Sequence, residues 1–496
     1  MSTPVHVDQV LFRAEEAFHR YKRTSAADKA KFLRMIAADL EKLSDDFITV
    51  VMQETHLPEA RLKNEKNRTI HQLRSFAQLV ETGDWVQASI DTADRERKPL
   101  AKPDIRKMYF PLGPVVVFGA SNFPLAFSTA GGDTASALAA GCSVIVKSHP
   151  AHPQTSKYVA QVIDQAIEAC GMPKYIFQHV EDTSIEVGQQ LVKHAATQAV
   201  AFTGSYQGGK ALFDLACKRK RPIPVFAEMG SVNPVVVLPS AMKDNNLPGM
   251  LASSILLGAG QFCTNPGLLL VAQNDLLDEF LQRLTEKMNA APSENMLHTG
   301  IAQNYHHRKK LTLSQAGVTL LTSRKEDQSD TATPALAVVD VKDFIANGVM
   351  KEEVFGPFSL AVKCVDEIEM LSVAASLDGQ LTASIFGSPE ECAALAGVID
   401  VLQERSGRVI YGGVPTGVEV CKSMHHGGPF PATTDSRFTS VGTDAIYRFV
   451  RPLSFQDFPQ EMLPDELKDQ NPRKILRCIN QVWTRDAVRV LNFQPA

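Results

Sequence analysis

A chain of 496 residues, 44% of them hydrophobic, is long enough for two or three domains with substantial cores. Its formal net charge of -4, with both signs spread along the chain, leaves no basic stripe for nucleic acid. The first residues lack the basic start and apolar stretch of a signal peptide, and no run of about 18 apolar residues predicts a membrane span. We therefore expect a cytoplasmic protein without nucleic-acid or membrane partners.

Helices are predicted over the first hundred residues, where apolar side chains recur at helical spacing between charges: Phe32, Leu33, Ile36, Leu40 and Leu43. The polar, proline-punctuated stretch at 91–113 predicts an exposed excursion such as a hairpin. From residue 113 onward, short β-branched strands alternate with helices, and a second such series begins near residue 224. This alternation predicts an α/β fold with open, doubly wound parallel sheets. The polar tail after residue 446 predicts an extended arm, which could contact another subunit or its own chain.

The eight cysteines form no Cys-x-x-Cys pair and no Cys/His cluster with zinc spacing, so we expect no metal site. Scattered cysteines also fit a reducing compartment. One of them, Cys263, lies in the glycine-bounded stretch "GQFCTNPG" at 260–267. A buried cysteine usually packs within an apolar run. Because this turn leaves room beside the sulfur, Cys263 is a candidate nucleophile, with simple packing as the alternative.

Polar residues follow several of the predicted strands, where ligands of doubly wound sheets bind. Asn122 follows "GPVVVF" and Glu228 follows "IPVFA". Each has a plainer interpretation: asparagine is a common turn former, and a carboxylate at a strand end is often just solvated. The stretch "KEEVFGP" at 351–357 could equally be a helix end that leads into a turn. None of these signals is specific by itself.

Together, in this order and rough spacing, these sequence patterns are specific. The stretches "FGASNFPLAFS", "SVIVKSHP", "FTGS", "AEMGSVNP", "GQFCTNPG" and "EEVFGP" resemble those of the aldehyde dehydrogenase superfamily, and the similarity extends over nearly the whole chain. The resemblance implies two Rossmann-like domains and a small oligomerisation arm. The expected ranges are 1–97 with 111–228 for the cofactor-binding domain, 229–428 for the catalytic domain, and 98–110 with 446–496 for the arm.

The same resemblance implies the catalytic roles. Cys263 attacks the aldehyde as a thiolate, the reactive form of cysteine. The side-chain amide of Asn122 and the backbone N–H of Cys263 stabilise the oxyanion, and one such donor is worth about 3 kcal/mol. Glu228 activates the water that hydrolyses the thioester, as a general base. A catalytically silent structural protein of the same fold is a remote alternative, since all three residues are present.

Cofactor positions also follow from the resemblance, which implies NADP or NAD without a Gly-x-Gly-x-x-Gly motif. The expected cofactor-binding residues are Lys147, His149, Gly204, Ser205, Gly209, Glu353 and Phe355. Many NAD-preferring relatives carry a glutamate three residues after the lysine, where it repels a 2′-phosphate. Here that position is Pro150, which favours NADP. Ser231 stands where a glycine is commoner.

The substrate is the least constrained part. The stretches at 118–156 and 426–442 resemble the branch that oxidises α-ketoglutarate semialdehyde, with an NADP-linked fatty aldehyde branch beside it. Medium or long aliphatic aldehydes are thus the main alternative, and a coenzyme-A-acylating relative is disfavoured by Glu228. Pocket candidates are Phe123, Phe127, Thr264 and Arg437. We expect a homodimer or homotetramer.

Overall fold

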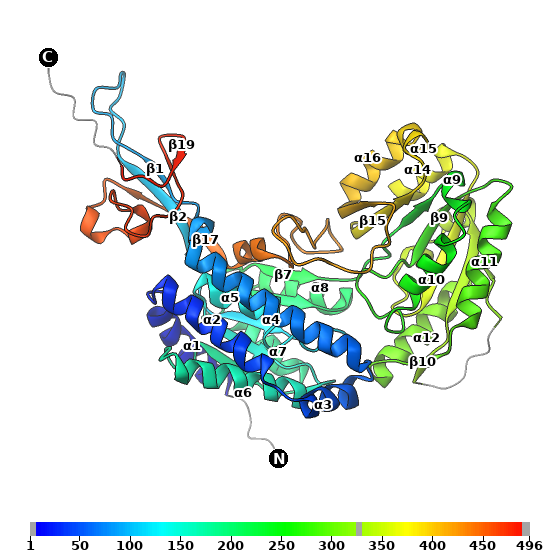
Figure 1. Ribbon diagram of the computed structural model, residues 1–496, viewed down its shortest axis with the longest axis horizontal. Helices are drawn as coiled ribbons and strands as arrows, with labels where there is room; N and C mark the ends of the chain where they lie inside the picture. The colour runs from blue at the N-terminus through cyan, green and yellow to red at the C-terminus, as the bar shows by residue number, and fades with distance from the viewer. Residues whose placement is uncertain (1–5, 324–329, 489–496) are drawn as a thin grey trace.

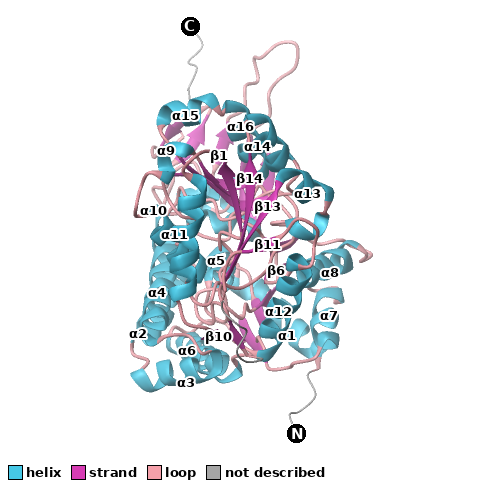
Figure 2. Cartoon of the chain, turned by 90° about the vertical axis from the view of Figure 1, so that its right-hand side faces the viewer, coloured by secondary structure: helices cyan, strands magenta, loops and turns pink. Residues whose placement is uncertain are grey.

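The computed structural model describes residues 6–323 and 330–488 and consists of two α/β lobes and a projecting arm (Figure 1). The parts of the expected ranges at 1–5, 324–329 and 489–496 lie outside the described residues. Short, buried strands form the centre of each lobe, and helices cover them (Figure 2). Among the described residues, no helix combines the length and apolar character needed to cross a bilayer.

The first lobe contains a parallel five-stranded sheet in the order β5-β4-β3-β6-β7. Its strands are β3 (Val115–Phe118), β4 (Val144–Lys147), β5 (Phe177–Val180), β6 (Ala199–Thr203) and β7 (Val225–Glu228). Its helices are α1 (Val7–Tyr21), α2 (Ala26–Glu41), α3 (Asp45–Thr55), α4 (Glu59–Thr82), α5 (Gly132–Ala140), α6 (Pro153–Ala169), α7 (Ile185–Lys193) and α8 (Tyr206–Cys217). The chain order reverses between β3 and β6, which opens a crevice at the carboxyl ends of these strands.

The second lobe contains a seven-stranded sheet in the order β11-β13-β14-β9-β8-β15-β16. Its strands are β8 (Val235–Val237), β9 (Leu268–Ala272), β11 (Thr319–Leu320), β13 (Ala335–Asp340), β14 (Phe358–Cys364), β15 (Gln380–Phe386) and β16 (Ser406–Tyr411), beside the two-stranded pair β10 (Glu294–Asn295) and β12 (Thr331–Ala332). Its helices are α9 (Pro239–Met242), α10 (Leu247–Leu256), α11 (Leu277–Ala290), α12 (Thr299–Leu313), α13 (Val341–Ala346), α14 (Glu367–Ala375), α15 (Pro389–Ala394) and α16 (Ala396–Arg405). Two apolar clusters pack on its strands, as expected for a sheet covered on both faces.

The arm is a five-stranded sheet in the order β17-β2-β1-β18-β19. Its strands are β1 (Ser89–Asp91), β2 (Ile105–Pro111), β17 (Val450–Gln456), β18 (Arg477–Ile479) and β19 (Val482–Thr484). The 3₁₀ turns of the chain are η1 (Asp84–Val86), η2 (Gly348–Lys351), η3 (Thr443–Phe449), η4 (Gln460–Met462) and η5 (Asp465–Leu467). Strands β1 and β2 form an antiparallel pair joined by residues 92–104, so the polar stretch is a hairpin. Because β1 pairs only with strands of the arm, the arm sheet begins before residue 98.

The segment after β16 returns from the second lobe to the first. It forms an antiparallel bridge between Thr433 and Glu228, and the backbone N–H of Met229 donates to the carbonyl of Ala432 at 2.8 Å. The edge of β7 therefore faces this returning segment, defined here as residues 425–441. This arrangement brings residues from three distant parts of the sequence to one strand end.

Candidate active site

The carboxyl ends of the first sheet meet at one edge. In the parallel register, Phe118 pairs with both Lys147 and Phe202, and Thr203 pairs with Glu228. The loop that follows β3 carries Asn122 to the same edge. The polar residues that follow separate strands in the sequence are thus neighbours in space, as the parallel topology requires.

The turn that carries Cys263 follows α10 and is tightly built. Gly258, Ala259 and Gly260 all have positive φ angles, of 57°, 55° and 67°. A β-carbon at Gly260 would lie 2.2 Å from the carbonyl carbon of Gly356, so only glycine fits there. The side-chain amide of Asn233 donates to the carbonyl of Cys263 at 2.9 Å. These contacts fix where the sulfur points.

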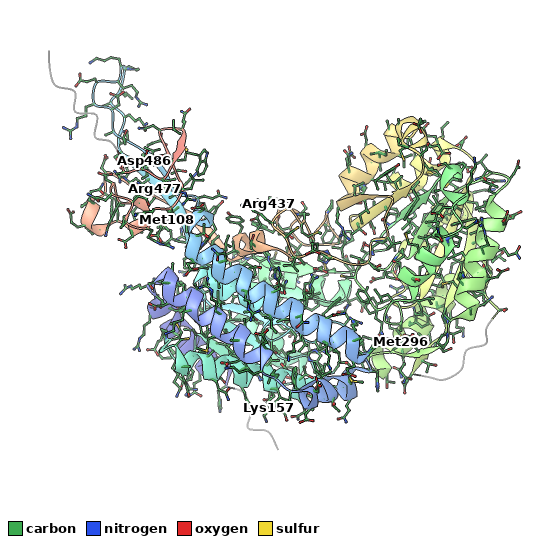
Figure 3. All side chains as sticks on the ribbon, viewed as in Figure 1. Met108, Lys157, Met296, Arg437, Arg477 and Asp486 are labelled. Atoms are coloured by element: carbon green, nitrogen blue, oxygen red, sulfur yellow. The ribbon has the colours of Figure 1, made fainter. Side chains whose placement is uncertain are left out.

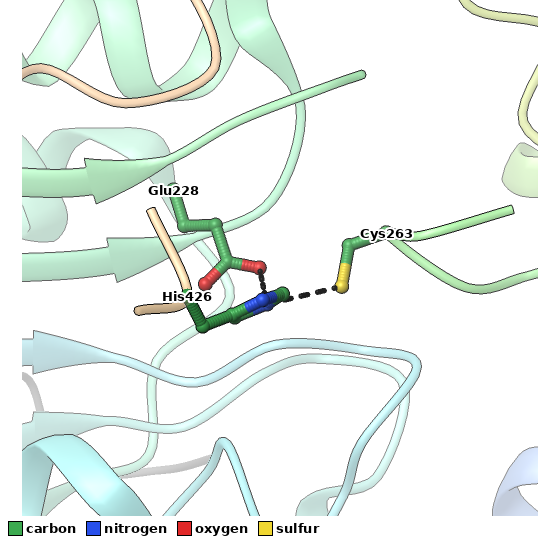
Figure 4. Close-up of side chains that lie close together, drawn as sticks. All are labelled: Glu228, Cys263 and His426. Atoms are coloured by element: carbon green, nitrogen blue, oxygen red, sulfur yellow. Dashed lines mark hydrogen bonds and ion pairs between the residues drawn. The ribbon is translucent and has the colours of Figure 1, made fainter. Parts of the chain in front are cut away.

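Cys263 meets Glu228 and His426 between the two lobes (Figure 4). Nε2 of His426 lies 3.0 Å from Oε1 of Glu228 and 3.5 Å from Sγ of Cys263. Glu228 and His426 are only 4% and 2% exposed. The cysteine approaches from the opposite side to the other two residues, because it belongs to the second lobe. A thiol, an imidazole and a carboxylate thus lie within hydrogen-bond reach, so the thiol can lose its proton to the histidine or to the carboxylate.

His426 is the member of this cluster that the sequence interpretation missed. The returning segment delivers it, and its backbone N–H donates to Oγ1 of Thr439 at 2.9 Å. From the same segment, the hydroxyl of Ser440 donates to Oε2 of Glu228 at 2.6 Å. Both oxygens of Glu228 therefore have polar partners. The only hint in the sequence is that His426 opens the glycine-proline stretch "HGGPFP".

The electrostatics of the pair determine where the proton resides. Burial opposes ionisation of Glu228, but the charge of His426 and the hydrogen bonds from His426, Ser440 and Cys263 bring its pKa below the ordinary carboxyl value. Burial raises the pKa of the Cys263 thiol well above its ordinary value, and the charge of Glu228 raises it further. Without cofactor or substrate, the site thus holds a thiol beside a carboxylate.

Asn122 is tied to the same turn. Its side-chain amide donates to the carbonyl of Gln261 at 3.1 Å, two residues before Cys263. Its own backbone carbonyl accepts a 2.5 Å hydrogen bond from Arg61 of α4. The structure therefore brings the three expected catalytic residues Cys263, Glu228 and Asn122 to one place.

Sequence comparison agrees with this geometry. The sequence model of the aldehyde dehydrogenase family matches residues 1–412. The chain belongs to the aldehyde dehydrogenase family. It is 44% identical over 484 residues to an α-ketoglutaric semialdehyde dehydrogenase of Acinetobacter baylyi, covering 97% of this chain and 92% of that one. It is 45% identical over 474 residues to α-ketoglutaric semialdehyde dehydrogenase 2 of Azospirillum brasilense, covering 95% and 90%.

Solved structures share the fold of this aldehyde dehydrogenase. Apo betaine aldehyde dehydrogenase of Staphylococcus aureus (a glycine-to-serine mutant) superposes with a TM-score of 0.77 at 19% identity, covering 91% of this chain and 88% of that one. Glyceraldehyde-3-phosphate dehydrogenase of Methanocaldococcus jannaschii, complexed with NADP, has a TM-score of 0.77 at 19% identity, covering 92% and 95%. As a member of the family, the chain is an oxidoreductase that acts on aldehydes with a nicotinamide cofactor.

Several expected cofactor residues lie along the sheet edge. Nζ of Lys147 donates to the carbonyl of Asp182 at 2.7 Å, and Ser205 caps α8 by accepting the N–H of Gly208 at 3.2 Å. Gly204 directly precedes this cap, so the backbone N–H groups at the N-terminus of α8 are available to bind a phosphate. Gly209 differs from the others: it is buried, and a β-carbon there would lie 2.7 Å from the Met229 side chain. Gly209 thus allows α8 to pack on the strand behind it.

The remaining cofactor candidates are His149, which follows β4, and two residues of the second lobe. The His149 ring lies 5.5 Å from that of His152, and burial, followed by the charges of nearby histidines and Lys147, lowers the pKa of His149 to about 3. Glu353 lies against Gly230, where a β-carbon would come within 2.5 Å of its Oε2. Burial raises the pKa of Glu353 to about 7. Phe355 lines the same small cavity as Glu353.

Three of the four expected pocket residues lie beside the cluster and one does not. The rings of Phe123 and Phe127 are 5.4 Å apart, and Phe127 lies 6.4 Å from His426. Thr264, next to Cys263, is buried. The Arg437 side chain, in contrast, is 79% exposed and pairs with Asp435 at 2.6 Å (Figure 3). The structure does not bring Arg437 to the cluster, because its nearest carboxylate holds it at the surface.

The Glu228, Cys263 and His426 cluster also has the spacing of a metal site, since the three ligand atoms lie within 4.8 Å of one another. A bound metal would occupy the sulfur that the reaction needs as a nucleophile. We therefore still predict that the active enzyme works without a metal.

Proposed function

We propose that this aldehyde dehydrogenase oxidises α-ketoglutarate semialdehyde to 2-oxoglutarate with NADP. The observation that carries the proposal is the cluster of Cys263, His426 and Glu228, with the Asn122 amide at the same turn. The substrate follows from the two α-ketoglutaric semialdehyde dehydrogenases that are 44% and 45% identical over almost the whole chain.

The residues divide the reaction into two stages. In the first, Sγ of Cys263 forms a bond to the aldehyde carbon, and the thiol proton passes to the Glu228–His426 pair. The former carbonyl oxygen becomes an oxyanion, which the Asn122 amide and the Cys263 N–H stabilise. A bound nicotinamide supplies the acceptor for the hydride that leaves this carbon. In the second stage, Glu228 takes a proton from water, the water oxygen bonds to the thioester carbon, and the carbon–sulfur bond breaks, so that Cys263 leaves as a thiolate. Of the two protons that Glu228 and His426 have then taken up, one returns to the thiolate and the other is released with the carboxylate product.

The residues at the sheet edge fit a dinucleotide. Lys147 would hold the adenosine ribose, Gly204 and Ser205 the pyrophosphate, and Glu353 the nicotinamide ribose. The choice of NADP rests on Pro150, which stands three residues after Lys147 where a glutamate would repel a 2′-phosphate. Burial, together with the charges of His152, His298 and Lys147, lowers the pKa of His149 to about 3, so the choice of NADP does not rest on a charge at this histidine.

The assembly and location complete the proposal. The arm would make the chain a homodimer or homotetramer, and the enzyme would work in the cytoplasm. Hydrolysis rather than transfer to a thiol is proposed for the second stage, because Glu228 is buried beside Cys263 with both its oxygens hydrogen-bonded.

A kinetic panel tests the proposal. We expect kcat/KM to be highest for α-ketoglutarate semialdehyde among dicarboxylate semialdehydes, aliphatic aldehydes and aromatic aldehydes, and to be higher with NADP than with NAD. Cys263→Ala should remove NADPH formation from every aldehyde while the circular dichroism spectrum stays unchanged. A preference for long aliphatic aldehydes would refute the substrate, a large preference for NAD would refute the cofactor, and turnover by Cys263→Ala would refute the nucleophile.

A further inference from the structure

Three arginines lie half-buried close to Cys263, and none forms a salt bridge in the part of the chain that the structure describes. Arg61 and Arg68 lie on one face of α4, two helical turns apart, and Arg408 comes from β16 of the other lobe. The N-terminal end of α4 lies next to the second lobe (Figure 1). Among the ion pairs of the described residues, none includes any of these three guanidinium groups. Each of the three nevertheless has one guanidinium nitrogen that is shielded from solvent and has no acceptor in the described structure, which needs an explanation.

Arg61 packs against two aromatic rings whose neighbours in the chain are Cys263 and Asn122. Its guanidinium carbon lies 4.5 Å from the centre of the Phe262 ring and 4.9 Å from that of Phe123. Phe262 directly precedes Cys263, and Phe123 directly follows Asn122. One terminal nitrogen of Arg61 donates to the carbonyl of Asn122, but the other, Nη1, is buried with no acceptor in the described structure.

Arg68 and Arg408 contact one short stretch of the chain from opposite lobes. Arg68 donates to the carbonyl of Val418, and Arg408 donates to those of Pro415 and Gly417, at 2.6 and 3.2 Å. The Nε atom of each arginine is buried without an acceptor in the described structure. Val418 packs in the same apolar cluster as Phe123 and Phe127. The positive charges therefore surround an apolar patch beside the nucleophile.

The carboxylate that lies between Arg61 and Arg68 on α4 forms no salt bridge with either of them in the described structure. Glu65 lies one turn from both Arg61 and Arg68 on α4, but its Oε1 accepts the backbone N–H groups of Leu125 and Ala126 at 2.8 and 2.9 Å. Burial lowers the pKa of Arg61 and Arg68, and the negative charge of Glu65 partly opposes this effect. A buried N–H donor without an acceptor is costly. An anionic ligand that accepted from these donors would remove that cost.

We propose that Arg61 and Arg68 bind the carboxylate of the substrate, while Arg408 adds positive charge from the opposite lobe. The inference rests on the proposed function, because it assigns the specificity of the same site. It names the ligand class as short aldehydes that end in a carboxylate, including 2-oxo acids, whose keto oxygen is a further acceptor. An uncharged aliphatic aldehyde leaves the guanidinium donors unpaired, and a site built around such donors discriminates strongly against that ligand.

The competing explanation is that both arginines only hold backbone carbonyls in place. It predicts equal losses for all aldehydes, so the decisive quantity is a ratio. We measure kcat/KM for α-ketoglutarate semialdehyde and for pentanal, an uncharged aldehyde of the same chain length, in the full-length enzyme. Charged hydrogen bonds of this kind predict that Arg61→Met and Arg68→Met each lower the ratio of the two values by roughly 10- to 100-fold.

Controls make each outcome informative. Arg74→Met removes a half-exposed arginine of the same helix that pairs with Glu41, and should leave the ratio unchanged. Arg61→Lys keeps the charge but not the bidentate fork, should give an intermediate ratio, and serves if Arg61→Met does not fold. An unchanged ratio in both Met variants, with a wild-type preference for the semialdehyde, would overturn the carboxylate role alone. A wild-type enzyme without that preference would overturn the proposed substrate and the carboxylate role together.

Discussion

At the residue scale, Glu228 has two opposite effects on Cys263. Its negative charge and hydrogen bond keep the thiol protonated, yet in the second stage it is the base that the thioester requires. Replacing it with the neutral Gln removes the charge that raises the pKa of Cys263, so that pKa falls and more thiolate exists at pH 8. The two effects are therefore separable in one variant.

Glu228→Gln should make Cys263 more reactive and the enzyme slower. We expect alkylation of Cys263 by iodoacetamide at pH 8, in the absence of cofactor, to be several-fold faster than in the wild type. Turnover should fall by roughly 100-fold or more, with an acyl-enzyme visible by intact mass. Peptide mapping separates Cys263 from the exposed Cys217, which is the internal reference. Slower alkylation would show that Glu228 promotes thiolate formation, and rapid deacylation would exclude it as the base.

The limits of sequence interpretation are also clearest at this scale. Cys263, Glu228 and Asn122 stand in short local patterns, which the family resemblance makes specific. His426 is 198 residues from Glu228 and joins it only through the returning segment, so no local pattern announces the contact. Arg437 belongs to a stretch that resembles the family, but it pairs with its neighbour Asp435 at the surface. The half-buried arginines Arg61 and Arg68 come instead from a helix whose charges look like those of a solvated face.

At the element scale, the turn before Cys263 shows how backbone shape positions a side chain. Gly260 has a φ of 67° and packs against the backbone of Gly356, in the stretch that also carries Glu353. Two motifs far apart in sequence thus meet without an intervening side chain. The alternation of strands and helices was predictable from β-branched runs and glycine boundaries, but this approach of two backbones was not, because no periodicity encodes it.

Gly260→Ala should damage both stability and catalysis. An L-residue at this φ costs roughly 1–2 kcal/mol, and the methyl group must also displace the Gly356 backbone. We expect the free energy of unfolding in guanidinium to fall by about 2 kcal/mol or more. We also expect kcat/KM to fall by about 100-fold, because a shift of the sulfur by about 1 Å has such an effect.

The matched control for this change is Gly249→Ala in α10. Gly249 has no positive φ, and a β-carbon there would meet nothing within 4 Å. Alanine is the better helix former, so this variant should be neutral or more stable by up to about 1 kcal/mol. Equal behaviour of the two variants would contradict the close approach at Gly260.

At the scale of the whole molecule, catalysis depends on two lobes that meet at one cluster. The first lobe provides Glu228 and Asn122, the second provides Cys263, and the returning segment provides His426. The arm lies apart from this cluster (Figure 1). Its small apolar core holds it together but gives it no part in the chemistry. The exposed surface of the arm is therefore the part of it that is available for a function outside the chemistry.

The edge strand β19 of the arm exposes apolar side chains. Val482 is 64% exposed and Trp483 57% exposed, and β19 has a neighbour on one side only. Exposed apolar residues on an open strand edge favour association with another chain. We expect the enzyme to be a dimer or tetramer by size-exclusion chromatography with light scattering, and the double variant Val482→Lys with Trp483→Lys to shift it to smaller species. The secondary structure of the variant should stay unchanged, because neither side chain belongs to the arm core. A monomeric wild type, or a variant that keeps the full assembly, would contradict the role of this edge in subunit association.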